Sequence, residues 1–223
     1  MSNPMILVVG AGPGVSSSVA RRFGREGYDV GLVGLGPVLE EVGTSLQDEG
    51  ITTGWTEADV TDEAALTAAV QRLASFQGRL DVLHFNPSAF RQKDPLTLTV
   101  PELLRDVALG VGALLTSVQA ARPYLSRGGR VTATGSMAAD RPWHEAASLG
   151  VQKAGLRNLV HSIDRTLQPA GIRAVSLTVE GTLAPDDLSS PFHPDAVAEA
   201  VHAAASQDEE QWQSEVRHPG VRG

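Results

Sequence analysis

Three glycines near the N-terminus, Gly10, Gly12 and Gly14, have the spacing of a loop that holds a phosphate group. They follow an apolar run that ends at Val9 and precede a segment of helical periodicity that begins near Ser16. Such glycines let the backbone approach a pyrophosphate, while the N–H groups at the start of the next helix attract an anion. The same glycines could serve only to make a tight turn, but their place in the first strand–helix unit favours a nucleotide site.

A second group of residues that could do chemistry lies in the second half of the chain. Ser136 and Lys153 carry a hydroxyl and an ammonium group, and the stretch between them contains His144 beside Glu145. Histidine has a pKa suited to general acid catalysis, but a surface position beside Trp143 is the simpler interpretation of His144. No grouping of histidines and carboxylates in the sequence has the spacing of a metal site.

Two further titratable residues are weaker candidates. Glu180 is a second possible proton donor, although a surface or helix-capping role is favoured, and His84 is expected to be a hydrogen-bonded core residue within an apolar segment. The chain has no cysteine, which excludes disulfides, thiolate metal sites and a cysteine nucleophile.

The elements that must position these residues alternate between short apolar strands and amphipathic helices. Strands are expected at residues 5–9, 29–35, 52–58, 80–85, 130–134, 172–179 and, at an edge, 211–217. Helices are expected at residues 16–26, 38–49, 62–76, 101–125, 146–167 and 194–206. This alternation predicts an α/β fold with a single doubly wound parallel sheet of about seven strands and helices on both faces. A length of 223 residues with 42% hydrophobic content predicts one domain over residues 1–223.

Composition also restricts the partners. The net charge is −8, and no basic stripe or run of like charge is present, which argues against nucleic acid and membrane surfaces as partners. The apolar run after Pro4 is too short for a secretion signal and lacks a basic flank, so a cytoplasmic location is expected.

Ser136, Leu149 and Lys153 stand at the spacing of a known catalytic set, Ser-x12-Tyr-x3-Lys, except that the middle residue is leucine. Together with the glycine loop, this spacing resembles the short-chain dehydrogenase/reductase family, and the resemblance extends to about Thr182. The resemblance implies a Rossmann-type fold, a bound NAD or NADP, and hydride transfer between the nicotinamide and an alcohol or carbonyl substrate.

The resemblance also implies a role for each catalytic position. Ser136 matches the serine that hydrogen-bonds the substrate oxygen, and Lys153 matches the lysine that holds the nicotinamide ribose. Leu149 takes the place of the tyrosine that transfers a proton, and leucine has no proton to give. Leu109 aligns with an asparagine that anchors a water leading to the lysine. Neither tyrosine of the chain is followed by lysine four residues later, so a shifted alignment does not restore the set.

The cofactor contacts that the resemblance implies are more completely matched than the catalytic positions. They are assigned to Gly10, Gly12, Gly14, Val15, Asp59, Val60, Asn86, Lys153, Gly181 and Thr182. Ser16 replaces the third glycine of the family loop, where it either narrows the loop or supplies a hydroxyl. Asp59 is assigned to the adenine amino group, with a turn or helix-capping role as the alternative.

The choice between NAD and NADP is only weakly indicated. In the family it depends on charged residues at the end of the second strand, which here reads Val33-Gly34-Leu35-Gly36-Pro37. A missing carboxylate removes a repulsion against a 2′-phosphate, and the sequence therefore leans weakly to NADP.

Three functional hypotheses remain open at this point. They are an oxidoreductase that uses a displaced proton source, a catalytically silent dinucleotide-binding protein, and a non-redox enzyme such as an isomerase or lyase in the same cleft. The resemblance further implies a homodimer or homotetramer that pairs the helix at 101–125 and the Lys153 helix. The apolar positions assigned to that interface are Ala113, Leu114, Ala154 and Leu156.

Overall fold

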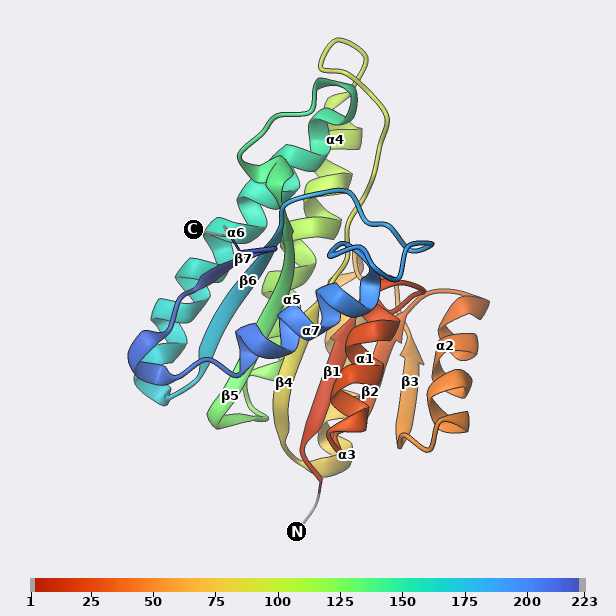
Figure 1. Ribbon diagram of the computed structural model, residues 1–223, viewed down its shortest axis with the longest axis vertical. Helices are drawn as coiled ribbons and strands as arrows, with labels where there is room; N and C mark the ends of the chain where they lie inside the picture. The colour runs from red at the N-terminus through yellow and green to blue at the C-terminus, as the bar shows by residue number, and fades with distance from the viewer. Residues whose placement is uncertain (1–2, 221–223) are drawn as a thin grey trace.

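The computed structural model, which describes residues 3–220, contains one parallel sheet with helices on both faces (Figure 1). The sheet has seven strands in the order β3-β2-β1-β4-β5-β6-β7. They are β1 (Met5–Val9), β2 (Asp29–Gly34), β3 (Thr53–Glu57), β4 (Leu80–Phe85), β5 (Leu125–Ser136), β6 (Arg173–Val179) and β7 (Glu215–His218). Every residue of β1 and β6 is buried, as expected for strands that are covered on both sides.

The helices form two layers. One face carries α1 (Val15–Arg25), α2 (Pro37–Asp48) and α7 (Pro194–Ala205), and the other carries α3 (Glu63–Gln77), α4 (Val100–Val107), α5 (Ala113–Ala121) and α6 (Ala147–Leu167). Local signals start several of them. Asp62 caps α3 by accepting a hydrogen bond from the Ala65 N–H at 3.0 Å, and Thr99 forms a capping box with Glu102 at the start of α4.

The helix expected at residues 101–125 is interrupted and shorter. A π-helical turn, Ala108–Gly112, separates α4 from α5, and α5 ends at Ala121, shortly before Pro123, which cannot continue the hydrogen-bonding pattern of a helix. The stretch Val100–Ala121 is long and apolar enough to cross a membrane by length and composition alone. Because it packs against α3 and α6 in the helical layer of the sheet, it does not point to a membrane protein.

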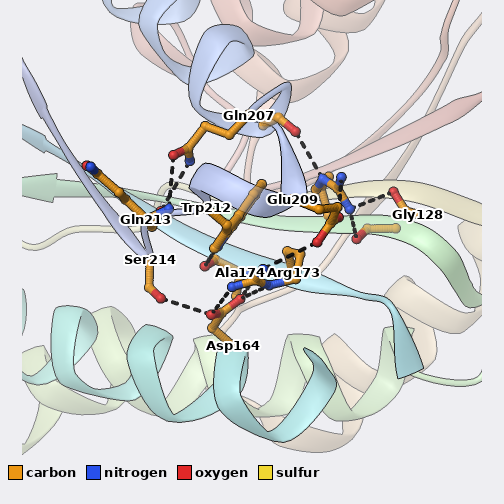
Figure 2. Close-up of polar contacts among 12 residues, drawn as sticks. Gly128, Asp164, Arg173, Ala174, Gln207, Glu209, Trp212, Gln213 and Ser214 are labelled. Carbon is orange, nitrogen blue, oxygen red and sulfur yellow. Dashed lines mark hydrogen bonds and ion pairs between the residues drawn. The ribbon is translucent and has the colours of Figure 1, made fainter. Parts of the chain in front are cut away.

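The C-terminal strand is fastened by a buried ion pair (Figure 2). Asp164 in α6 accepts two hydrogen bonds from the Arg173 guanidinium, at 2.9 and 2.8 Å. It also accepts the Ser214 hydroxyl, at 2.9 Å, and the Trp212 ring lies 4.8 Å from the same guanidinium. These contacts hold the segment before β7 against the sheet, so β7 extends the sheet beside β6 as the predicted parallel edge strand.

Candidate active site

The glycine loop lies at the carboxyl edge of the sheet, where the strand order reverses between β1 and β4. The N–H groups of Gly10 and Ala11 both donate to the Val33 carbonyl, at 2.9 and 2.8 Å, which fixes the loop on β2. Gly14 has a φ of 86°, a conformation that favours glycine, and a Cβ added there would meet no atom within 4 Å. Within the described residues, no side chain caps α1, which begins at Val15. The first N–H groups of α1 therefore face open space that suits a phosphate.

Ser16 does not narrow this loop. Its hydroxyl donates to the Gly10 carbonyl at 2.7 Å and accepts a hydrogen bond from Nδ2 of Asn86, also at 2.7 Å. The side chain is buried and turned away from the open space above Gly12 and Gly14. The hydroxyl therefore ties the glycine loop to the segment that follows β4, which is a link the sequence alone did not reveal.

Asp59 forms a turn at the end of β3. One carboxylate oxygen accepts hydrogen bonds from the Thr61 N–H at 2.8 Å and from the Thr61 hydroxyl at 2.7 Å. The first of these bonds is the main reason that the pKa of Asp59 is lowered. Asp59 is exposed and neighbouring Val60 is half-buried at the same edge of the sheet. The structure thus gives Asp59 the turn role and leaves its other oxygen for the assigned contact with adenine.

Ser136 ends β5, beside Val179 at the end of β6. Its Oγ accepts a hydrogen bond from the Ala138 N–H at 3.2 Å, so the hydroxyl hydrogen is available to a substrate oxygen. The side chain is half-buried, which leaves it accessible from the carboxyl edge. This geometry suits the role that the resemblance implies for Ser136.

Lys153 is a buried ammonium group. Only 5% of the residue is exposed, and Nζ donates to the Thr134 carbonyl at 2.8 Å, which is its one hydrogen bond to the described residues. Burial lowers the pKa of Lys153 to about 8. The hydroxyl of Thr134 is also buried without a partner among the described residues. A ligand that offers oxygen atoms would add to the hydrogen bonding of Lys153.

His84 departs from the expectation of a fully hydrogen-bonded core residue. Its Nδ1 lies 2.9 Å from the Thr132 hydroxyl, but its Nε2 is buried with no partner among residues 3–220. Burial and then the nearby Lys153 cation lower the pKa of His84 to about 3, so the ring is neutral at physiological pH. A ring that is neutral and fully buried is not a proton donor for chemistry at the edge of the sheet.

The residues on either side of Leu149 hold the segment after β4. Ser148 donates to the Asp106 carboxylate at 2.8 Å, and Asp106 pairs with Arg91 through two hydrogen bonds, at 2.9 and 2.8 Å. Gln152 pairs with the backbone of Ala89, accepting from its N–H at 3.1 Å and donating to its carbonyl at 3.2 Å. Ser148, Asp106 and Gln152 are buried. Leu149 therefore lies between two residues of α6 that are fixed by hydrogen bonds, and it makes no such bond through its own side chain.

Leu109 lies within the π-helical turn, at the position that the resemblance assigns to an asparagine. The adjacent Gly110 is buried against Gln152, and a Cβ added to Gly110 would lie 2.7 Å from Oε1 of Gln152. The amide of Gln152 thus fills the space between the two active-site helices at this level. A leucine and a packed amide replace the polar asparagine expected from the resemblance.

His144 and Glu180, the two possible proton donors near the site, have other surroundings. His144 is exposed and lines an apolar groove of about 700 Å³ between α4 and α6, together with Val100, Val151 and Ala154. Glu180 is bound by Arg217 of β7, and Arg141 lies 3.9 Å from its carboxylate. Among the described residues neither side chain hydrogen-bonds Ser136, and the surface interpretations of both residues are favoured.

The cofactor-side loop begins at Gly181 and Thr182, after β6. A Cβ added to Gly181 would lie 2.4 Å from the ring of Phe192, so this glycine permits the close packing of that ring. The Ala184 N–H donates to the Phe192 carbonyl at 3.0 Å, which closes the loop over residues 184–192. Thr182 is exposed at the mouth of the site.

The positions expected to form an oligomer interface need correction. Ala113, Leu114 and Leu156 are buried in the core of the chain itself, with 2%, 0% and 1% of each residue exposed. The resemblance assigned these residues to an outer face, but they pack in the core with residues of α3 and the sheet. Only Ala154 lines the outer groove.

Comparison with known proteins identifies the family of this chain. A family described as Enoyl-(Acyl carrier protein) reductase matches residues 10–217. Cis-4-hydroxycyclohexanecarboxylate dehydrogenase of Sinomonas cyclohexanicum is 30% identical over 75% of this chain and 68% of its own length. Oxidoreductase UcpA of Escherichia coli strain K12 is 28% identical over 75% of this chain, but the match spans slightly less than two thirds, 65%, of its length.

Among solved structures, a short chain dehydrogenase from Mycobacterium smegmatis has a TM-score of 0.88 and 25% identity, covering 100% of this chain and 94% of that one. The chain therefore belongs to the short-chain dehydrogenase/reductase family of oxidoreductases. The family generally binds NAD or NADP, and the residues present here fit such a cofactor. The glycine loop is open, the start of α1 is uncapped within the described residues, and Lys153 makes a single hydrogen bond to them.

Proposed function

We propose that this protein binds a nicotinamide dinucleotide and interconverts an alcohol and a carbonyl group, using a proton source other than residue 149. The observation that carries the proposal is the buried ammonium of Lys153, which has a single carbonyl partner among the described residues. Burying a cation with so few hydrogen bonds is costly, and the ribose hydroxyls of a bound dinucleotide would offset that cost. The open glycine loop at the same edge of the sheet supplies the place for the pyrophosphate.

When bound, the nicotinamide supplies or accepts the hydride. The Ser136 hydroxyl, free to donate, orients the substrate oxygen, and Lys153 holds the ribose and adds positive charge near that oxygen. Leu149 can neither give nor take a proton, so the proton comes from water or another acid. A positioned general acid typically accelerates a reaction by about 10² to 10⁴-fold, and we expect turnover to be slow by roughly that factor.

The test combines binding with a designed gain of function. Calorimetry with NADH and NADPH measures binding, and reduction of a carbonyl panel is compared for wild type, Leu149→Tyr and Leu149→Phe. The Phe variant is the matched control because it adds the ring without the hydroxyl. We expect cofactor binding, weak native activity, and a partial gain for the Tyr variant only. No binding of either nucleotide would refute the proposal.

A second function is favoured by a specific observation. Leu149 and Leu109 are apolar where the resemblance implies polar groups that pass a proton, and the nearby amide of Gln152 is already hydrogen-bonded to the backbone of Ala89. A dinucleotide-binding protein without catalysis, acting as a sensor or assembly partner, would have this pattern. Tight cofactor binding combined with no turnover by wild type or Leu149→Tyr on any carbonyl would select this function over the first.

A further inference from the structure

The end of β2 receives a carboxylate from the neighbouring strand. The sheet register places Gly34 of β2 beside Glu57 of β3, and Oε1 of Glu57 accepts a hydrogen bond from the Gly36 N–H at 3.0 Å. Residues 33–37 contain no charged side chain of their own. Glu57 therefore brings a negative charge to the loop between β2 and α2, where the sequence of that loop provides none.

This carboxylate also occupies the anion position of α2. Gly36 is the N-cap of α2, and the N-terminal end of a helix carries partial positive charge that attracts an anion. Glu57 already binds the N–H of that residue, and Glu40 adds a second carboxylate in the first turn. A phosphate approaching the start of α2 would therefore meet two carboxylates instead of an open helix end.

No cation in this part of the chain offsets those charges. Between Arg25 and Arg72 the sequence contains no lysine or arginine, but it contains ten aspartates and glutamates. The preceding arginines belong to α1 and are bound to carboxylates, as in the pair of Arg21 with Glu49 at 2.6 Å. The half of the site formed by β2, α2 and β3 is therefore built without a basic side chain.

We infer that Glu57 makes the dinucleotide site selective for NAD over NADP. The inference rests on the proposed function, because it concerns the adenosine end of the same cofactor. A ribose 2′-hydroxyl can donate a hydrogen bond to the carboxylate, whereas a 2′-phosphate, with a charge near −2, is repelled by it. The weak lean to NADP drawn from residues 33–37 is reversed, because the charge comes from the adjacent strand rather than from β2 itself.

The test is a comparison of dissociation constants for NADH and NADPH, measured by calorimetry on the full chain. Glu57→Gln removes the charge and keeps an oxygen that can accept the Gly36 N–H, so the loop should stay folded. Asp48→Asn is the matched control, since it removes one exposed acidic charge at the far end of α2. Thermal unfolding of all three proteins confirms that the fold is retained.

We expect wild type to bind NADH at least about tenfold more tightly than NADPH, in line with one nearby unit charge. Glu57→Gln should reduce that ratio about tenfold, mainly by improving NADPH binding, and Asp48→Asn should leave it unchanged. If wild type binds NADPH as tightly as NADH or more tightly, the inference is overturned but the proposed function is sustained. The same holds if Glu57→Gln leaves the ratio of the two dissociation constants unchanged. Failure to bind either nucleotide overturns both.

Discussion

Removal of the Asp164 carboxylate is predicted to lower the free energy of unfolding more than most other single changes in charge. Asp164 and Arg173 side chains are 4% and 8% exposed, and the carboxylate accepts four hydrogen bonds, from two guanidinium nitrogens, the Ala174 N–H and the Ser214 hydroxyl (Figure 2). The substitution Asp164→Asn keeps the size of the side chain but leaves the guanidinium facing an amide. A buried cation then loses its principal counter-ion.

The expected loss of stability follows from the burial of this ion pair. Breaking a buried ion pair by removing one partner costs about 3–5 kcal/mol, whereas an exposed pair contributes about 0–1 kcal/mol. Glu209 lies 3.3 Å from another nitrogen of Arg173 and keeps part of the compensation, so we expect a loss near the lower limit, about 3 kcal/mol. For a chain of this size such a loss lowers the melting temperature by about 6–12 °C.

The same ion pair predicts a dependence on pH. Burial by itself would raise the pKa of Asp164, but hydrogen bonds from Arg173, Ala174 and Ser214 outweigh it and lower the pKa below the ordinary value of 3.8. A lowered carboxylate pKa contributes stability that is fully present above pH 3.8 and is lost as the pH falls through the folded-state pKa. The difference between wild type and Asp164→Asn should therefore be constant near neutrality and shrink in acid.

Chemical denaturation at pH 7 and pH 3 measures both effects. The control is Asp186→Asn, an exposed aspartate in the loop after β6, for which we expect a change within about 0.5 kcal/mol. A loss below about 1 kcal/mol for Asp164→Asn at pH 7 would contradict the assigned energy. A loss that is equally large at pH 3 would show that packing, and not charge, holds the segment before β7.

Two further predictions concern binding and assembly. Lys153→Met should weaken dinucleotide binding by about tenfold or more, because a charge-assisted hydrogen bond contributes about 1.5–3 kcal/mol. An unchanged affinity, measured by calorimetry, would show that Lys153 has only a structural role. We also propose that a second copy of the chain covers the apolar groove between α4 and α6, where Val151 is 50% exposed. Light scattering should then show an oligomer for wild type and a monomer for Val151→Glu. The control Phe76→Glu, on the surface of α3, should remain an oligomer. A wild-type monomer would refute the interface.

Much of the fold could be predicted because its signals are local. Fully buried parallel strands are short, continuous apolar runs, and Asp62 marks the start of α3 as a polar N-cap. The errors lie where local pattern is ambiguous. Periodicity continued the helix of residues 101–125 through a π-helical turn and past Ala121, and it extended β7, which the structure limits to Glu215–His218.

The site was less predictable because its decisive contacts join distant segments. The bond from Asn86 to Ser16 spans 70 residues, and the bond from Gly36 to Glu57 spans 21. Nothing in the local sequence of residues 33–37 indicates that a carboxylate reaches them, since the register of β2 on β3 decides it. Such contacts depend on which strands become neighbours, and that is a property of the assembled sheet.

The residues around Leu149 limit the activity that the substitution Leu149→Tyr can restore. Gln152 packs its amide against Gly110 and pairs with the backbone of Ala89, so the space between the π-helical turn and α6 is filled one helical turn from Leu149. A tyrosine at position 149 would restore an acidic hydroxyl, but the packed amide and Leu109 provide no polar route for its reprotonation, which we therefore expect to be slow. Leu149→Tyr would restore proton donation but not fast reprotonation of the tyrosine. We therefore expect this substitution to raise the rate of a single turnover more than it raises the steady-state rate.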